Sequence, residues 1–301
     1  MTTLALQPSI FGLNEKSKSG VLNLISNSHD KPMDLNTVVP WSKGVDRNLL
    51  PKKAEHCWLY GTPHFDDLTK EQLNEVLWLE NARDVSMFIT LEQTIPPLYM
   101  GFINSNPGRL SPEVEEYCMI FSKEEIVHSL VFKRYLKLAK LPMFSPPANL
   151  QEMLLVHVPK MHPVAGILTT LIVEWGAELS AMYSSQTDDI EPFTREMNYQ
   201  HHIDESRHIA FGRWVGESFF EKASEQDAKL VRDQCQLVMK HFIPQFTYNP
   251  EIAKFTSFKF PIAVDDIEQI ELVRNSPTNT ARNEKRFAPL YAWLKKLEIK
   301  V

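Results

Sequence analysis

Cysteine is scarce in this sequence, which has 301 residues and contains only Cys57, Cys118 and Cys235. The three are isolated and odd in number, and none lies in a Cys-x-x-Cys spacing. These features exclude a disulfide framework and a zinc knuckle. We therefore expect ordinary buried thiols in the reducing environment of the cytoplasm.

Long apolar runs and an excess of basic charge are also missing. No stretch of 18 or more apolar residues occurs, so we expect no membrane-spanning segment. The N-terminal sequence MTTLALQPSIFGLNEKSKSG lacks the charged and then apolar regions of a secretory signal. Lysine and arginine number 32 against 38 acidic residues, which leaves no basic stripe for nucleic acid. We thus expect neither a membrane nor a nucleic acid as partner.

The chain contains no glycine-rich phosphate loop and no internal repeat, and its length suits one domain with a large core. Residues 1–65 are rich in Ser, Asn, Pro and Lys without sustained periodicity, which predicts a segment that wraps the surface. Residues 66–243 predict a helical bundle, and residues 244–301 a C-terminal extension. Together they form a single domain.

Helical periodicity and end signals predict seven helices. Thr69 and Gln72 have the spacing of a capping box at the start of the first, and Pro96 and Pro97 should kink or end it. Pro112 and Ser224 mark the starts of two others. The predicted ranges are 66–99, 111–141, 163–185, 191–223, 224–242, 265–274 and 278–297.

Two of these helices carry a Glu-x-x-His element, formed by Glu125 and His128 in one helix and by Glu205 and His208 in the other. Residues three apart on a helix point the same way, so each element presents a carboxylate and an imidazole to one point. One such pair alone occurs often by chance and is weak support for a metal site.

Two further helices each place a glutamate within strongly apolar sequence, Glu92 in MFITLEQTI and Glu174 in TLIVEWGAEL. An unpaired carboxylate is costly to bury, so such a position needs a compensating charge. Two divalent cations would balance the four carboxylates. The order Glu, Glu-x-x-His, Glu, Glu-x-x-His on successive helices is the di-iron pattern of ferritin-like bundles. We therefore predict an all-α, ferritin-like or ribonucleotide-reductase-like bundle with additional peripheral helices.

Several neighbouring residues compete for roles at this site. Glu178 lies one turn beyond Glu174 on nearly the same face, and we prefer Glu174 for its more apolar surroundings. Asp204 and Glu124 precede the two ligand glutamates. They either accept the free imidazole N–H of a ligand histidine on a neighbouring helix or lie in solvent.

His201 is a candidate third histidine ligand. At 100° per residue, His201, Glu205 and His208 fall within about 60° of arc. The alternatives are a core histidine bonded to a carbonyl group, or His202 in its place.

In these residues the sequence resembles the p-aminobenzoate N-oxygenase family of di-iron enzymes. The matching residues are Glu92, Glu125, His128, Glu174, His201, Glu205 and His208, and the string HHIDESRH is the most specific part. In ordinary ferritins, desaturases and ribonucleotide reductase small subunits the fourth helix supplies only Glu-x-x-His. The resemblance, which covers roughly residues 70–240, therefore favours His201 as the additional ligand.

The resemblance implies an oxygenase that uses two iron ions and O₂ to oxidise an amine to a hydroxylamine, nitroso or nitro product in secondary metabolism. Mixed carboxylate and imidazole ligation suits iron or manganese. The substrate is an arylamine or an amino acid, free or tethered to a carrier, and an external electron donor is needed because no flavin or nicotinamide motif occurs. Apart from the metal ligands we assign no catalytic residue.

Other readings remain open at this point. A ferritin-like iron-binding protein would normally be about half this length, and a di-iron hydroxylase or desaturase acting on carbon does not need the additional histidine. A purely structural bundle would leave four core glutamates unexplained. Arg282 and Arg286 are candidates to hold a substrate carboxylate, but we expect them to be exposed, which is the commoner state of arginine. Apolar stripes along the long helices are compatible with a homodimer.

Overall fold

The computed structural model describes residues 11–34, 36–185 and 188–300, except for the side chains of residues 179–185. The first half of the N-terminal stretch that we inspected for a signal, residues 1–10, lies outside this range. Every regular element of the described residues is helical and no strand occurs among them, which confirms the predicted all-α class. None of the described helices is long and apolar enough to cross a membrane.

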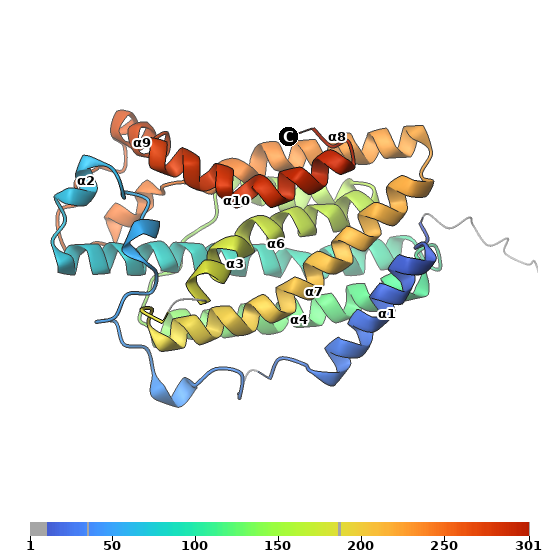
Figure 1. Ribbon diagram of the computed structural model, residues 1–301, viewed down its shortest axis with the longest axis horizontal. Helices are drawn as coiled ribbons and strands as arrows, with labels where there is room; N and C mark the ends of the chain where they lie inside the picture. The colour runs from blue at the N-terminus through green and yellow to red at the C-terminus, as the bar shows by residue number, and fades with distance from the viewer. Residues whose placement is uncertain (1–10, 35, 186–187, 301) are drawn as a thin grey trace, which may run out of the picture.

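Four long helices form the centre of the molecule and run side by side (Figure 1). They are α3 (Lys70–Ser105), α4 (Pro112–Leu138), α6 (Pro163–Ser185) and α7 (Pro192–Lys222). The most extensive contacts pair α3 with α4 and α6 with α7. These are the four helices on which the sequence places the candidate ligands.

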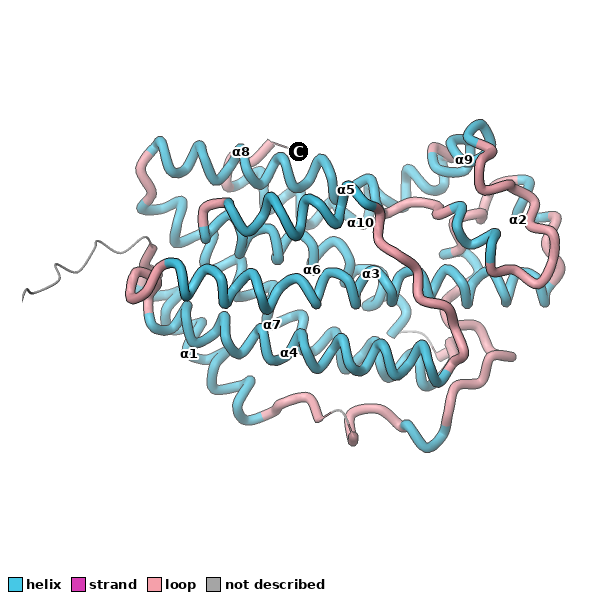
Figure 2. The backbone as a smooth tube through the Cα atoms, turned by 180° about the vertical axis from the view of Figure 1, so that it is seen from behind, coloured by secondary structure: helices cyan, strands magenta, loops and turns pink. Residues whose placement is uncertain are grey.

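Further helices cover two opposite sides of this bundle. On one side, α8 (Glu225–Phe242) and α10 (Pro277–Lys296) pack against α6. On the other, α1 (Glu15–Asp30) lies across α4 and α7, as both backbone views show (Figure 2). The shorter elements are η1 (Trp41–Lys43), η2 (Ala54–His56), α2 (Pro63–Asp66), α5 (Ala148–Glu152), η3 (Met153–His157), η4 (Val158–Lys160), η5 (Ile243–Gln245), η6 (Pro250–Lys254) and α9 (Ile267–Arg274).

The helix starts follow the capping residues of the sequence. The side chain of Thr69 accepts from the backbone of Gln72, and Gln72 accepts from the backbone of Thr69, so the predicted capping box is confirmed. At α7 the Glu191 carboxylate accepts from the Thr194 backbone N–H at 2.7 Å. Such caps satisfy N–H groups that a helix cannot pair internally.

Of the two effects expected of Pro96 and Pro97, a kink or an end, the end is wrong, because α3 continues to Ser105; it also begins at Lys70 and not at residue 66. Each proline removes one backbone hydrogen bond. Tertiary packing outweighs that loss, since the residues that follow are anchored in the core: Tyr99 and Phe102 are buried, and the Tyr99 hydroxyl lies 2.5 Å from the Thr170 hydroxyl.

Residues 1–65, which we expected to wrap the surface and in which no helix was predicted, contain the helix α1. Its buried residues Val21, Leu24 and Ile25 recur at three- and four-residue steps, and the Asn14 side chain caps it by accepting from the Ser17 backbone. Because most of its other positions are Ser, Asn and Lys, the apolar stripe is narrow and easily overlooked. Beyond α1, only short helical turns interrupt this irregular segment.

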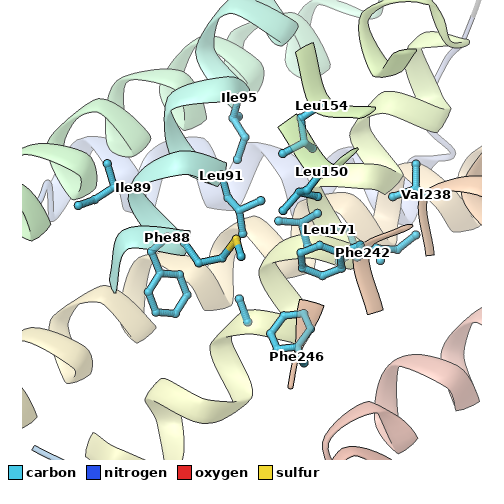
Figure 3. Close-up of a cluster of buried hydrophobic side chains, with 14 of the residues drawn as sticks. Phe88, Ile89, Leu91, Ile95, Leu150, Leu154, Leu171, Val238, Phe242 and Phe246 are labelled. Carbon is cyan, nitrogen blue, oxygen red and sulfur yellow. The ribbon is translucent and has the colours of Figure 1, made fainter. Parts of the chain in front are cut away.

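A hydrophobic core lies between α3, α6 and α8 (Figure 3). Leu91, Leu171 and Phe242 point toward one another from the three helices. The cysteines are all buried and free, which confirms that they are core thiols. This packing fixes the spacing of α3 and α6 next to the glutamates that each carries.

Candidate metal centre

Four glutamates and three histidines from the four long helices converge inside the bundle. None of the seven side chains is more than 2% exposed. They are Glu92 on α3, Glu125 and His128 on α4, Glu174 on α6, and His201, Glu205 and His208 on α7. All seven residues that the sequence singled out are therefore near the middle of the bundle.

Glu205 lies between histidines on both of its sides. One carboxylate oxygen, Oε1, is 3.1 Å from His201 Nε2 and 3.2 Å from His128 Nδ1. The other oxygen, Oε2, is 3.2 Å from His208 Nδ1. Burial alone would raise the pKa of Glu205, but His208 and His201 hold it well below its usual value. Glu205 is thus an anion that contacts His201 and His128 through one oxygen and His208 through the other.

Glu125 also contacts histidines through both of its carboxylate oxygens. Its Oε1 lies 2.9 Å from His208 Nδ1, and its Oε2 lies 3.7 Å from His128 Nδ1. Glu125 and Glu205 thus each direct one oxygen toward His128 and the other toward His208, an arrangement that could hold two neighbouring ions.

Ligand atoms close enough to hold one ion occur in two sets. Glu92, His128 and His201 form one set, and Glu125, His128 and Glu205 form the other, with the ligand atoms of each set within 4.8 Å of one another. Glu92 Oε1 is 3.1 Å from His201 Nε2.

Glu174 completes the group from α6. Burial and the carboxylates of Glu205, Glu125 and Glu92 raise its pKa well above the usual value. Four glutamates so close together repel one another as anions. Bound cations would remove that repulsion.

Glu178, the competitor of Glu174, has a different position. Its Oε2 lies 3.4 Å from His201 Nδ1, and its Oε1 lies 2.5 Å from His202 Nδ1. Glu178 therefore contacts the ring nitrogen of His201 that faces away from Glu92. Its contacts suit a residue that orients His201, whereas Glu174 is the glutamate of α6 beside the other three carboxylates.

The outer nitrogens of the other two histidines face carboxylates on the neighbouring helix. His128 Nε2 lies 3.0 Å from Asp204, and His208 Nε2 lies 2.8 Å from Glu124. This confirms the first of the two roles considered for Asp204 and Glu124. Sequence reasoning missed Arg207, whose guanidinium donates to both carboxylates. The three-residue spacing from Asp204 to Arg207 was the available signal.

The buried polar atoms of this group meet the test for a metal centre. Both oxygens of Glu125, Oε1 of Glu205 and of Glu174, and Nδ1 of His128 have no hydrogen-bond partner, although other polar atoms lie nearby. Buried polar atoms almost always have partners. Unpaired carboxylate oxygens and an imidazole nitrogen gathered in this way fit the ligand set of a metal ion, and their chemistry suits iron.

Aromatic rings enclose the centre. The Phe121 ring stacks on His208 with centroids 3.6 Å apart, and Phe88 and Phe132 contact the edge of His201. Such rings fix the imidazoles and keep bulk water away. Water exclusion strengthens the electrostatic interactions between the ligands and a bound cation.

Arg282 and Arg286 lie elsewhere, and the expectation that they are exposed is wrong. Both are partly buried, with their guanidinium groups over the Trp58 ring. Arg282 donates to the backbone carbonyls of Glu55 and Cys57. Arg282 thus ties the N-terminal segment to α10.

A sequence model described as p-aminobenzoate N-oxygenase AurF matches residues 15–297 of the chain. The match covers almost the entire length, including the first and last segments in which the resemblance was weak. No curated protein matches the chain significantly. Together with the helical architecture, the match confirms the predicted ferritin-like di-iron fold.

Proposed function

The chain belongs to the p-aminobenzoate N-oxygenase family of di-iron oxidoreductases, and on this premise we propose that it uses two iron ions and O₂ to oxidise an arylamine. The products would be a hydroxylamine, a nitroso or a nitro compound of secondary metabolism. The observation that carries the proposal is the convergence of four buried glutamates and three buried histidines in the middle of the bundle, where Glu125 and Glu205 each contact both His128 and His208. An amino acid, or an amine tethered to a carrier, is a further candidate substrate.

We assign the seven residues to the two ions as follows. Glu92, His128 and His201 would hold one ion, Glu174 and His208 would hold the other, and Glu125 and Glu205 would contribute to both. The contacts of Glu125 and Glu205 with histidines on both sides support a stoichiometry of two.

Iron held by carboxylates and imidazoles with a free position can activate O₂ for transfer of an oxygen atom to nitrogen. The protein positions and insulates this centre. Asp204 and Glu124 fix the orientation of His128 and His208 through their outer nitrogens, and Arg207 holds both carboxylates in place. The aromatic rings around the centre exclude water from it.

The reaction also needs reducing equivalents, which an external electron donor supplies. We further propose that the protein acts in the cytoplasm and forms a homodimer. Exposed apolar residues on neighbouring faces of α4 and α7 support the dimer, among them Ile126, Leu130, Tyr199 and Ile203. Sedimentation of the purified protein tests the dimer directly.

The function is tested by metal analysis and product analysis of the same preparation. Purified protein should contain about two irons per chain and, with reductant and ¹⁸O₂, convert p-aminobenzoate to products that carry ¹⁸O on nitrogen. Glu205→Ala should retain well below two irons and form no product. Glu217→Ala removes an exposed carboxylate of the same helix that is not among the seven and does not line the cavities next to the centre, and it should behave as wild type.

Each outcome has a separate meaning. Two irons with oxygen transferred only to carbon would replace the N-oxygenase with a hydroxylase or desaturase. Two irons without any substrate oxidation would favour iron binding as the function. Absence of iron, or full iron retention and activity in Glu205→Ala, would overturn the proposed centre.

A further inference from the structure

Two cavities lie next to each other between the N-terminal segment and the bundle. The outer cleft has about 610 Å³ of space that water can enter and is open to solvent. The inner pocket leaves no room for a water molecule between its side chains. Val38 and Val39 line both cavities, so these two side chains separate them.

The inner pocket ends at the candidate metal centre. Its wall includes Val39 from the N-terminal segment, Phe132 from α4 and Met197 from α7, and its floor includes His128 and His201. The lining is otherwise mostly apolar. A molecule that filled this pocket would contact the ring edges of two proposed iron ligands.

One face of α7 leads from the outer cleft to the centre. Phe193 lines the outer cleft, Met197 lines the inner pocket, and His201 lies at its floor. These residues follow one another at four-residue steps, so they share a face of the helix. Eight residues at 1.5 Å each give a path of about 12 Å.

The cover over this path is held in place. The Glu191 backbone N–H donates to the Leu50 carbonyl at 2.8 Å, and its carboxylate accepts from the Asp46 backbone N–H. The Trp41 ring packs on Phe193 with centroids 5.1 Å apart. The segment therefore forms a fixed wall on α7, and the two valines are its narrow point.

We propose that the amine substrate reaches the iron pair through this groove between α4 and α7, and that Val38 and Val39 limit which amines pass. The proposal rests on the function proposed above and specifies its substrate class. The inner pocket is apolar but closed to water, so a ring that carries the reacting amine enters it only when the side chains that line it move apart. The outer cleft presents charges of both signs, from Lys43, Asp46 and Arg195, and suits a polar tail or a tethering arm at the opposite end of the ring.

Three full-length variants test the passage. Val38→Phe narrows it and Val39→Ala widens it. Val45→Phe is the matched control, because Val45 is a partly buried valine of the same segment that lines neither cavity. The measurements are iron per chain, kcat/KM for p-aminobenzoate and for a fused two-ring arylamine, and calorimetric titration of the metal-free protein with p-aminobenzoate.

We expect Val38→Phe to raise KM and the calorimetric Kd for p-aminobenzoate at least fivefold, with iron content unchanged. Val39→Ala should shift the ratio of the two kcat/KM values at least threefold toward the fused-ring amine. Val45→Phe should stay within twofold of wild type in every measurement. Wild-type binding by Val38→Phe together with unchanged selectivity of Val39→Ala would overturn the passage.

The binding measurement separates this proposal from the proposed function. If the wild-type protein oxidises neither amine, the proposed function fails. The calorimetric Kd values alone then test whether the amine binds in the groove. Weaker binding by Val38→Phe than by Val45→Phe would still support it. Equal binding by these two variants, or no binding by any of the proteins, would overturn it.

Discussion

Replacing His201 with alanine separates a metal ligand from a histidine that only fills space. The imidazole is 2% exposed, its Nε2 lies 3.1 Å from both Glu92 and Glu205, and its ring contacts Phe88 and Phe132. His201→Ala therefore removes a candidate ligand atom and also leaves a cavity between aromatic rings. The two roles predict different measurable losses.

The cost in folding stability does not distinguish the roles. Truncating a buried side chain of this size costs roughly 2–4 kcal/mol whether or not it binds metal. The iron affinity does distinguish them. Residues that only support a ligand change metal affinity about 10–100-fold, so loss of His201 as a direct ligand should weaken one site at least about 100-fold, or at least about 2.7 kcal/mol.

The assay is a titration of metal-free protein with Fe²⁺ against a competing chelator, with urea unfolding of the same sample. Phe132→Ala is the control, because it removes a ring that touches His201 without removing a ligand atom. Both variants should lose stability, but only His201→Ala should fall from two tightly bound irons to about one. Two irons at wild-type affinity in His201→Ala would refute the ligand assignment.

Three further predictions concern the support of the centre. Asp204→Asn should lower iron affinity about 10–100-fold, because Asp204 orients His128. The same change at the exposed Asp188 should have no effect. Equal iron affinities of the two variants in the chelator titration would contradict this role of Asp204. Fe²⁺ at about 100 times its Kd should stabilise the protein by about 2.7 kcal/mol, and a melting curve that does not move with iron would count against a folded-state site. Gly212→Ala should lower the free energy of unfolding by about 1–3 kcal/mol, because the added Cβ would lie 2.7 Å from Leu171 Cβ. Gly101→Ala is the control: the added Cβ lies in open space on α3 and should not lower the free energy of unfolding.

Local signals made the bundle predictable. Thr69, Ser111 and Ser224 lie at the N-cap positions of α3, α4 and α8, and the side chains of Thr69 and Ser224 accept from the helix backbone. The predicted range 163–185 agrees with α6 at both ends. Caps and periodicity act within one or two turns, so they can be read without knowing the tertiary contacts.

Other features depend on contacts between residues that are far apart in the sequence, and local sequence patterns did not predict them. Glu174 and Glu178 differ by only about 40° around α6, so spacing alone cannot separate them. The structure separates them by their neighbours, since the pKa of Glu174 responds to three other carboxylates and Glu178 contacts His201 and His202. In the same way, α3 passes through Pro96 because the core holds the residues that follow.

The part of the chain that was hardest to predict is also the part that covers the proposed substrate path. The missed helix α1 and the irregular residues after it lie over α4 and α7. A metal centre needs fixed ligand geometry, which four long helices supply with strong periodic signals. Recognition of an amine needs a surface shaped to that amine, and surface segments without periodicity vary in shape at little cost to the bundle. Exchange of residues 33–49 between members of this family should therefore change amine selectivity while leaving iron binding intact.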